Sequence, residues 1–272
     1  MSLHLGKGTA PKVRRYPKNN QTFTWQQFIL PIVLLIIWQM FFELGLIRSI
    51  VLPPPSTVMK TIGELLQNGQ LFKHLGFSLI RVLEGFSLAV LFGLTLGIAM
   101  GLFRNVYLWL DMLIQVLRPI PPIAWIPLAI LWFGIDEMSK IFIIFLGAFF
   151  PILINVIEGI SQTDHKFVEV AKVLEISRLK FTSKIVLPGA LPSIMTGLRV
   201  GLGFSWMCVV AAELIAGTEG IGYMIMDARQ LAQTDVVLVG MLTIGITGKC
   251  FDYMLKALER KLLRWKTTYQ GA

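Results

Sequence analysis

Long runs of apolar residues with few charges recur along this chain of 272 residues. A helix needs roughly 20 mostly apolar residues to cross a bilayer, and six stretches reach or approach that length. Only 15% of the residues are charged, against about 25% in soluble domains, so much of the surface must face lipid. The sequence therefore predicts an all-α polytopic membrane protein with six transmembrane helices, at about 28–47, 77–103, 106–133, 141–157, 187–215 and 236–255.

Lysine and arginine are unequally divided between the segments that connect these spans. With the N-terminus inside, the inner segments hold 17 of them and the outer segments hold 5. Because basic residues are retained on the cytoplasmic side, both termini are predicted to be cytoplasmic. The net charge of +9 thus flanks apolar runs and does not form the basic patch of a nucleic-acid-binding surface. We expect one membrane domain over 28–258, between basic tails at 1–27 and 259–272.

Proline and glycine predict local features of the bundle. The prolines of the third span should bend its helix, because each removes a backbone donor. An extended Leu52–Pro55 segment should precede a short interfacial helix, capped by Ser56 or Thr57 and ending near Leu66. Glycines at four-residue spacing in the second span favour a close helix–helix seam, although glycine is also generally common in membrane helices. These residues are Pro119, Pro121, Pro122 and Pro127 in the third span, and Gly93, Gly97 and Gly101 in the second.

The inner loop at 161–186 carries an amphipathic pattern. Four apolar residues follow one another at i, i+3, i+4 and i+7 and form one stripe on a short helix. Ser177 is placed to cap a second short helix that carries Leu179 and Phe181. Such a helix rests on a bilayer surface or on a protein partner, and the pattern alone leaves both open. The stripe consists of Phe167, Val170, Ala171 and Leu174.

The same loop resembles the EAA loop of binding-protein-dependent ABC importer permeases. The resemblance rests on the spacing from Glu169-Val170-Ala171 to the Ile185-Val186-Leu187-Pro188 end. Two positions depart from the family pattern, since Val170 replaces an alanine and Glu175 stands where a glycine is expected. Further segments resemble the permeases for nitrate, sulfonate, taurine and bicarbonate, and are most similar to aliphatic sulfonate permeases. These segments are 117–127, 191–199, 220–223, 233–237 and 263–266.

This resemblance implies a type I ABC importer permease fold in a bacterial cytoplasmic membrane. It implies two permease copies forming a pore, as a homodimer, with two ATPase subunits that bind ATP and Mg and an external substrate-binding protein. The cargo would be an aliphatic sulfonate; the alternatives are taurine, nitrate, bicarbonate or a pyrimidine thiamine precursor. A remote alternative is an ion-coupled secondary transporter, which would show inverted repeats. The residues implied in ATPase coupling are Phe167, Glu169, Val170, Ala171, Leu174, Glu175, Ile185, Leu187 and Pro188.

The chain is predicted to be neither an enzyme nor a metal protein. Gly6-Lys7-Gly8-Thr9 lacks the spacing of a phosphate-binding loop, so ATP must be bound by a partner. His4, His74 and His165 do not have the spacing of metal ligands, and no nucleophile lies in a recognisable catalytic setting. We therefore expect no cofactor in this chain.

Charged residues inside the spans are candidates for the translocation pathway. A mid-span arginine normally faces protein or a water-filled cavity, and Arg118 and Arg199 are such residues. Either could help an anion through a pore. The alternative is a structural ion pair with Asp111, Glu158 or Glu213. Arg81 is instead expected to pair locally with Glu84, three residues later. The candidates for the translocation pathway are therefore Arg118, Arg199 and Glu213.

Overall fold

The computed structural model describes residues 26–163, 169, 173 and 175–263. Every regular element in these residues is helical, which confirms the all-α prediction. Four helices are long and apolar enough to cross a membrane: α3 (Gln70–Leu102), α6 (Glu137–Ser161), α9 (Leu187–Ala216) with the turns before it, and α11 (Thr234–Leu262). A bent helix pair brings the total to five, and α1 (Gln26–Glu43) is apolar but shorter. The predicted count of six spans is therefore not confirmed.

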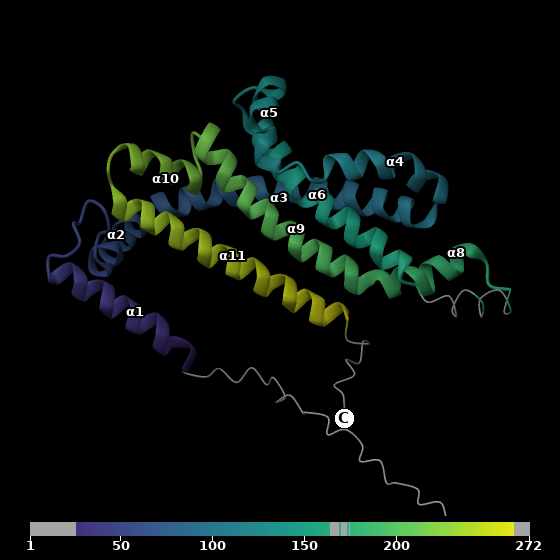
Figure 1. The fold of residues 1–272 in the computed structure, drawn as a ribbon, viewed down its shortest axis with the longest axis horizontal. Helices are drawn as coiled ribbons and strands as arrows, with labels where there is room; N and C mark the ends of the chain where they lie inside the picture. Colours follow the sequence, from purple (N-terminus) through teal and green to yellow (C-terminus); the bar gives the residue numbers. More distant parts are fainter. Residues whose placement is uncertain (1–25, 164–168, 170–172, 174, 264–272) are drawn as a thin grey trace, which may run out of the picture.

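The proline-rich third segment is broken into two arms. α4 (Arg104–Leu117) is followed by a 3₁₀ turn, η1 (Pro122–Trp125), and by α5 (Ile126–Phe133). The two arms meet at 88°, which confirms the predicted bend. Prolines between the arms lack the N–H groups that would continue the helical ladder. In Figure 1, α5 stands away from the long helices at the top of the view, while α4 runs along their right-hand part.

The glycine seam of α3 packs against α6. A Cβ added to Gly93 would lie 2.9 Å from Ile152, one added to Gly97 would lie 2.8 Å from Val156, and Gly101 faces Ile160 in the same way. Gly85 adds an earlier contact, with Ile144. Each glycine meets the residue 59 positions later, so α3 and α6 run parallel and in register. The seam predicted from glycine spacing is confirmed, and it lies within one chain.

An adjoining side of α6 packs against α9, and Ile152 lies against glycines of both neighbours, Gly93 of α3 and Gly201 of α9. A Cβ at Gly147 would lie 2.7 Å from Cys208 Sγ, and one at Gly197 would lie 2.7 Å from Asn155 Cβ. Partners later in α6 thus meet residues earlier in α9, so these two helices are antiparallel. α6 is therefore held between α3 and α9, and Ile152 and Val156 are fully buried there. In lipid the hydrophobic effect does not drive helices together, and the van der Waals attraction between closely packed backbones joins them instead.

Two short helices join the bundle at one end, beside the start of α11. α2 (Pro55–Gln67), α10 (Ile221–Gln230) and α11 share a small apolar cluster, and Thr61 Oγ1 donates to Asp235 Oδ2 at 2.6 Å. The expected cap at Ser56 or Thr57 is wrong, because α2 begins one residue earlier, at Pro55, with no side-chain cap. Proline suits the first helical position since its missing N–H would be unsatisfied there anyway. α1 lies along the outside of the assembly, at the lower left of Figure 1.

Candidate functional site

The inner loop returns to the bundle through one continuous helical rod. α8 (Arg178–Phe181), a π-helical turn, η2 (Thr182–Val186), and α9 follow each other without interruption. The span from Leu179 to Ala216 has 38 residues, which corresponds to about 57 Å at 1.5 Å per residue. Val186 is buried in the core shared by α3, α6 and α9, and Phe181 and Leu187 pack against it. Ile185 and Pro188 are half-buried, so the end of the predicted coupling loop is anchored in the bundle.

All four residues of the predicted apolar stripe lie outside the described residues. This applies to Phe167, Val170, Ala171 and Leu174. Glu169 is described and exposed. The exposed apolar side chains of the loop include Val173, at 82%, and Leu179, at 86%.

Glu175 adopts a backbone conformation that usually selects glycine. Its φ is +52°, in the left-handed region that an L-residue with a side chain rarely enters. This is the position where the EAA pattern has a glycine, so the turn geometry expected of glycine is present although the residue is a glutamate.

A buried ion cluster joins three long helices. Arg81 of α3 bonds Glu213 of α9, with Nη1 and Oε1 2.7 Å apart, and Glu137 of α6, with Nη2 and Oε1 2.8 Å apart. Lys140 Nζ lies 2.9 Å from the same Glu137 oxygen. The side chains of Arg81, Lys140 and Glu213 are at most 3% exposed. The expected pair of Arg81 with Glu84 is therefore wrong, because burial directs the guanidinium toward the other helices.

The cluster also fixes the turn between α9 and α10. Arg81 Nη1 donates to the Glu219 carbonyl at 2.6 Å, and Ser78 Oγ accepts from the Ile221 N–H at 2.9 Å. Glu213 accepts from Ser78 and from the Gly222 N–H. Glu213 is thus a buried, hydrogen-bonded carboxylate that lines neither of the cavities described below, and its role in the translocation pathway stays a prediction. The sequence did contain a sign of the Arg81–Glu213 pair, because the two residues carry opposite charges in two apolar spans and charges within a membrane normally pair.

Arg199 is engaged in an ion pair at the surface of the bundle. Its Nη1 lies 3.4 Å from Glu259 Oε2, and its Nε lies 3.9 Å from Asp252 Oδ1. Both carboxylates belong to α11, so the pair ties α9 to α11. A structural pair was one of the two expectations for Arg199, but the partners differ from the three acidic residues considered.

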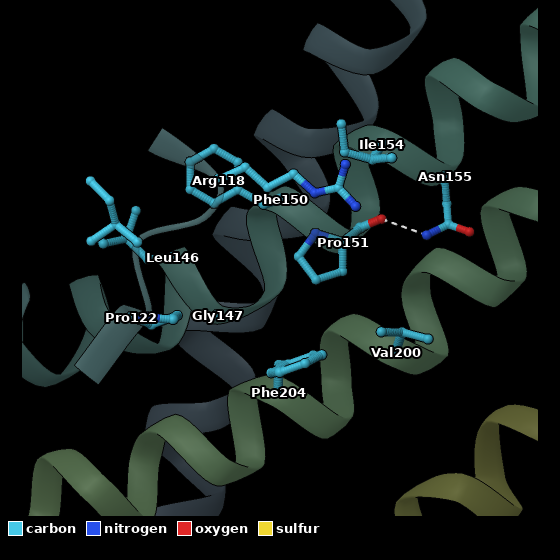
Figure 2. A pocket seen from close by; sticks show the side chains of 11 residues that line it. Arg118, Pro122, Leu146, Gly147, Phe150, Pro151, Ile154, Asn155, Val200 and Phe204 are labelled. Atoms are coloured by element: carbon cyan, nitrogen blue, oxygen red, sulfur yellow. Dashed lines mark hydrogen bonds between the residues drawn. The ribbon is translucent and has the colours of Figure 1, made fainter. Parts of the chain in front are cut away.

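Arg118 differs from the other two arginines. It follows the last residue of α4, at the start of the bend, and forms no ion pair with any residue in the described part of the chain. It lines one cavity of about 290 Å³ between α6 and α9, and a second of about 580 Å³ beside α4. Figure 2 shows its guanidinium near Pro151 and Ile154 of α6, with Val200 and Phe204 on α9.

Ligands for a metal ion do not converge in the described residues. No three His, Cys, Asp or Glu side chains in 26–163, 169, 173 and 175–263 are placed to hold one. His74 instead accepts a hydrogen bond from the Gly220 N–H through Nδ1, at 3.2 Å.

Known proteins share this sequence over nearly its whole length. It is 45% identical to the aliphatic sulfonates transport permease protein SsuC of Bacillus subtilis (strain 168), over 98% of this chain and 97% of that one. It is 41% identical to the taurine transport system permease protein TauC of Escherichia coli (strain K12), over 86% of each chain. The bicarbonate transport system permease protein CmpB of Synechococcus elongatus is 40% identical, over 85% of this chain and 86% of that one.

A solved structure shares the fold. The MetNI methionine ABC transporter, in inward facing conformations, matches with a TM-score of 0.60 at 16% identity, over 68% of this chain and 92% of that chain. Residues 89–264 match the family model described as the binding-protein-dependent transport system inner membrane component. This region includes the inner loop, the rod, the bend at Arg118 and all of α6, α9 and α11. The chain therefore belongs to the family of binding-protein-dependent inner-membrane transport components and is the permease subunit of an ABC importer.

Proposed function

We propose that this permease imports small organic anions, with aliphatic sulfonates as the cargo. The identity of 45% over nearly the full length to the SsuC relative supports this choice. The taurine and bicarbonate relatives, at 41% and 40%, follow closely, so taurine and bicarbonate are the rival cargoes. Aliphatic sulfonates, taurine and bicarbonate all carry an anionic group, which agrees with an unpaired arginine at a cavity within the membrane domain.

ATP hydrolysis in a partner ATPase drives this import through the inner loop. The loop helix docks on the ATPase by its apolar residues, and the rod from Leu179 to Ala216 transmits the movement. The support lies in the exposure of Val173 and Leu179 and in the anchoring of Val186 in the core. The rod itself is helical without interruption from Arg178 to Ala216, which suits it to moving as a rigid body.

The assembly consists of two permease copies, two ATPase subunits that bind ATP and Mg, and an external binding protein. Both termini lie in the cytoplasm, which agrees with 17 basic residues on the inner segments against 5 on the outer ones. Reporter fusions at the two ends test this orientation. A periplasmic reporter active at either end would contradict it.

Uptake by living cells tests the cargo. A strain lacking this subunit is given labelled ethanesulfonate, taurine, bicarbonate and nitrate in turn, with and without the complementing chain. We expect complementation to restore ethanesulfonate uptake most strongly. Restoration of taurine or bicarbonate uptake alone would assign the chain to that cargo instead.

Two loop substitutions test the coupling. Glu169→Arg reverses an exposed charge, and Ala171→Glu places a charge within the predicted apolar stripe. We expect either change to abolish ATP-driven uptake while the complex still assembles and still hydrolyses ATP. Lys60→Glu, which reverses an exposed charge in α2 outside the inner loop, is the matched control and should leave uptake intact. Normal uptake by both loop variants at normal expression would refute the coupling role.

A further inference from the structure

The cavity of about 290 Å³ beside Arg118 combines one charge with apolar walls. Its volume lies at the lower end of the range for small-molecule sites. Among the described residues that line it, Arg118 is the only charged one, and the walls come from α6 and α9. The wall residues are Leu146, Phe150, Ile154, Val200 and Phe204.

An arginine in a membrane domain needs a partner or water. Placing a guanidinium against lipid costs a few kcal/mol even on insertion scales. Arg81 and Arg199 both have carboxylate partners, whereas no described carboxylate pairs with Arg118. The guanidinium can donate several hydrogen bonds in one plane, a geometry that matches an oxyanion. Arg118 is exposed on the single chain, and its unpaired guanidinium beside an open cavity fits a partner that binds and leaves.

A second polar group faces the same cavity. Asn155 uses one amide N–H to bond the Pro151 carbonyl, at 2.8 Å (Figure 2). A side-chain amide has two such donors, so one remains for an anion held by Arg118. The larger neighbouring cavity has a different charge balance, because Asp111 and Glu158 line it together with Arg118. An anion is thus favoured on the α9 side of Arg118 and disfavoured on the side that holds the two carboxylates.

We propose that the smaller cavity is a transit site for an anion with an apolar tail, in which Arg118 and Asn155 hold the head and Phe150, Val200 and Phe204 hold the tail. This inference rests on the proposed function and narrows its substrate class to alkanesulfonates without an amino group. Taurine would bring an ammonium group to walls that offer no carboxylate, which is unfavourable. Nitrate and bicarbonate have no tail to fill the apolar walls.

Binding to the permease itself tests the site. The permease–ATPase complex in lipid nanodiscs, without binding protein, is titrated with labelled 1-butanesulfonate, methanesulfonate and taurine. Each buried methylene strengthens binding by about fourfold, so 1-butanesulfonate should bind at least about tenfold more tightly than methanesulfonate. Ethanesulfonate has the same two-carbon tail as taurine and is titrated beside it, and we expect taurine to bind at least about tenfold more weakly because of its ammonium group.

Matched variants separate the contribution of the anionic head to binding from that of the apolar tail. Arg118→Gln should weaken all sulfonates by about tenfold or more, whereas Arg104→Gln, at the other end of α4 and outside both cavities, should not. Phe204→Ala should weaken 1-butanesulfonate and leave methanesulfonate unchanged. Size-exclusion profiles and ATPase rates establish that each variant is assembled.

Two results would overturn the site. One is equal binding of methanesulfonate and 1-butanesulfonate by the native complex. The other is undiminished binding by an assembled Arg118→Gln complex. ATP-driven uptake of ethanesulfonate by the native complex with its binding protein is measured in parallel. If that uptake occurs without binding at Arg118, the site fails and the proposed function stands; if no anion is taken up, the proposed function itself fails.

Discussion

Gly97 provides the sharpest test of the α3–α6 seam. In Gly97→Ala the new Cβ would lie 2.8 Å from Val156 Cβ and 3.2 Å from the Leu153 carbonyl oxygen. Carbon atoms in contact normally stay about 3.5–4.0 Å apart, so the helices must separate by roughly 0.7 Å or Val156 must shift. Overpacking of this kind destabilises by about 1–3 kcal/mol. We expect the free energy of unfolding of the purified permease, measured by titration with SDS in mixed micelles, to fall by that amount.

Gly76 supplies a control on the same helix. A Cβ at Gly76 has no atom within 4 Å, so Gly76→Ala should be neutral or should stabilise by about 0.5–1 kcal/mol through reduced chain entropy. Val156→Ala should partly rescue Gly97→Ala, with a coupling of about 1 kcal/mol or more in the double-mutant cycle. The packing account is refuted if Gly97→Ala and Gly76→Ala have the same stability, or if the cycle is additive.

Three further substitutions have defined outcomes. Glu213→Ala removes one partner of the buried Arg81 and should lower the free energy of unfolding by about 3–5 kcal/mol, whereas the exposed Glu84→Ala should not lower it in the same SDS titration. Arg199→Gln breaks an ion pair whose arginine side chain is 36% exposed, so it should lower the free energy of unfolding by about 1 kcal/mol or less. Sulfonate uptake should be unchanged. A selective loss of uptake would instead support a role for Arg199 in the translocation pathway. Glu175→Gly should preserve ATP-driven uptake, because glycine readily adopts the φ of +52° found at this position. Glu175→Ile should impair uptake, since β-branched residues strongly avoid the left-handed region. Equal uptake by the two variants would contradict this backbone conformation.

Patterns within one helix were predictable from the sequence. The spacing of Gly93, Gly97 and Gly101 predicted a seam, because residues four apart share a helix face whatever they pack against. The prolines predicted a bend in the third segment, because they remove backbone donors. The angle of 88° was not predictable, since missing donors permit many angles and packing selects one.

Contacts between helices were much harder to predict. Arg81 was assigned to Glu84 because the two are close in sequence, yet its partners are 56 and 132 residues away. Arg118 and Arg199 looked alike as single mid-span arginines, and only the placement of α11 gives Arg199 its carboxylates. The alignment of one span against another decides such pairs, and a single sequence carries little information about it.

The parallel register of α3 and α6 limits how this protein can move. Each glycine is a notch that receives one side chain of α6, and the notches repeat every four residues between Gly93 and Gly101. Glycines four residues apart are separated by about 6 Å along the helix axis. If α6 slid along α3 by less than this distance, its side chains would collide with the larger residues of α3 that lie between the glycines. We therefore expect α3 and α6 to move together as one rigid unit. Alternating access then requires movement elsewhere, such as at the bend beside Arg118 or between α9 and α11, where Arg199 contacts Asp252 and Glu259 and Trp206 Nε1 donates to the Ile244 carbonyl.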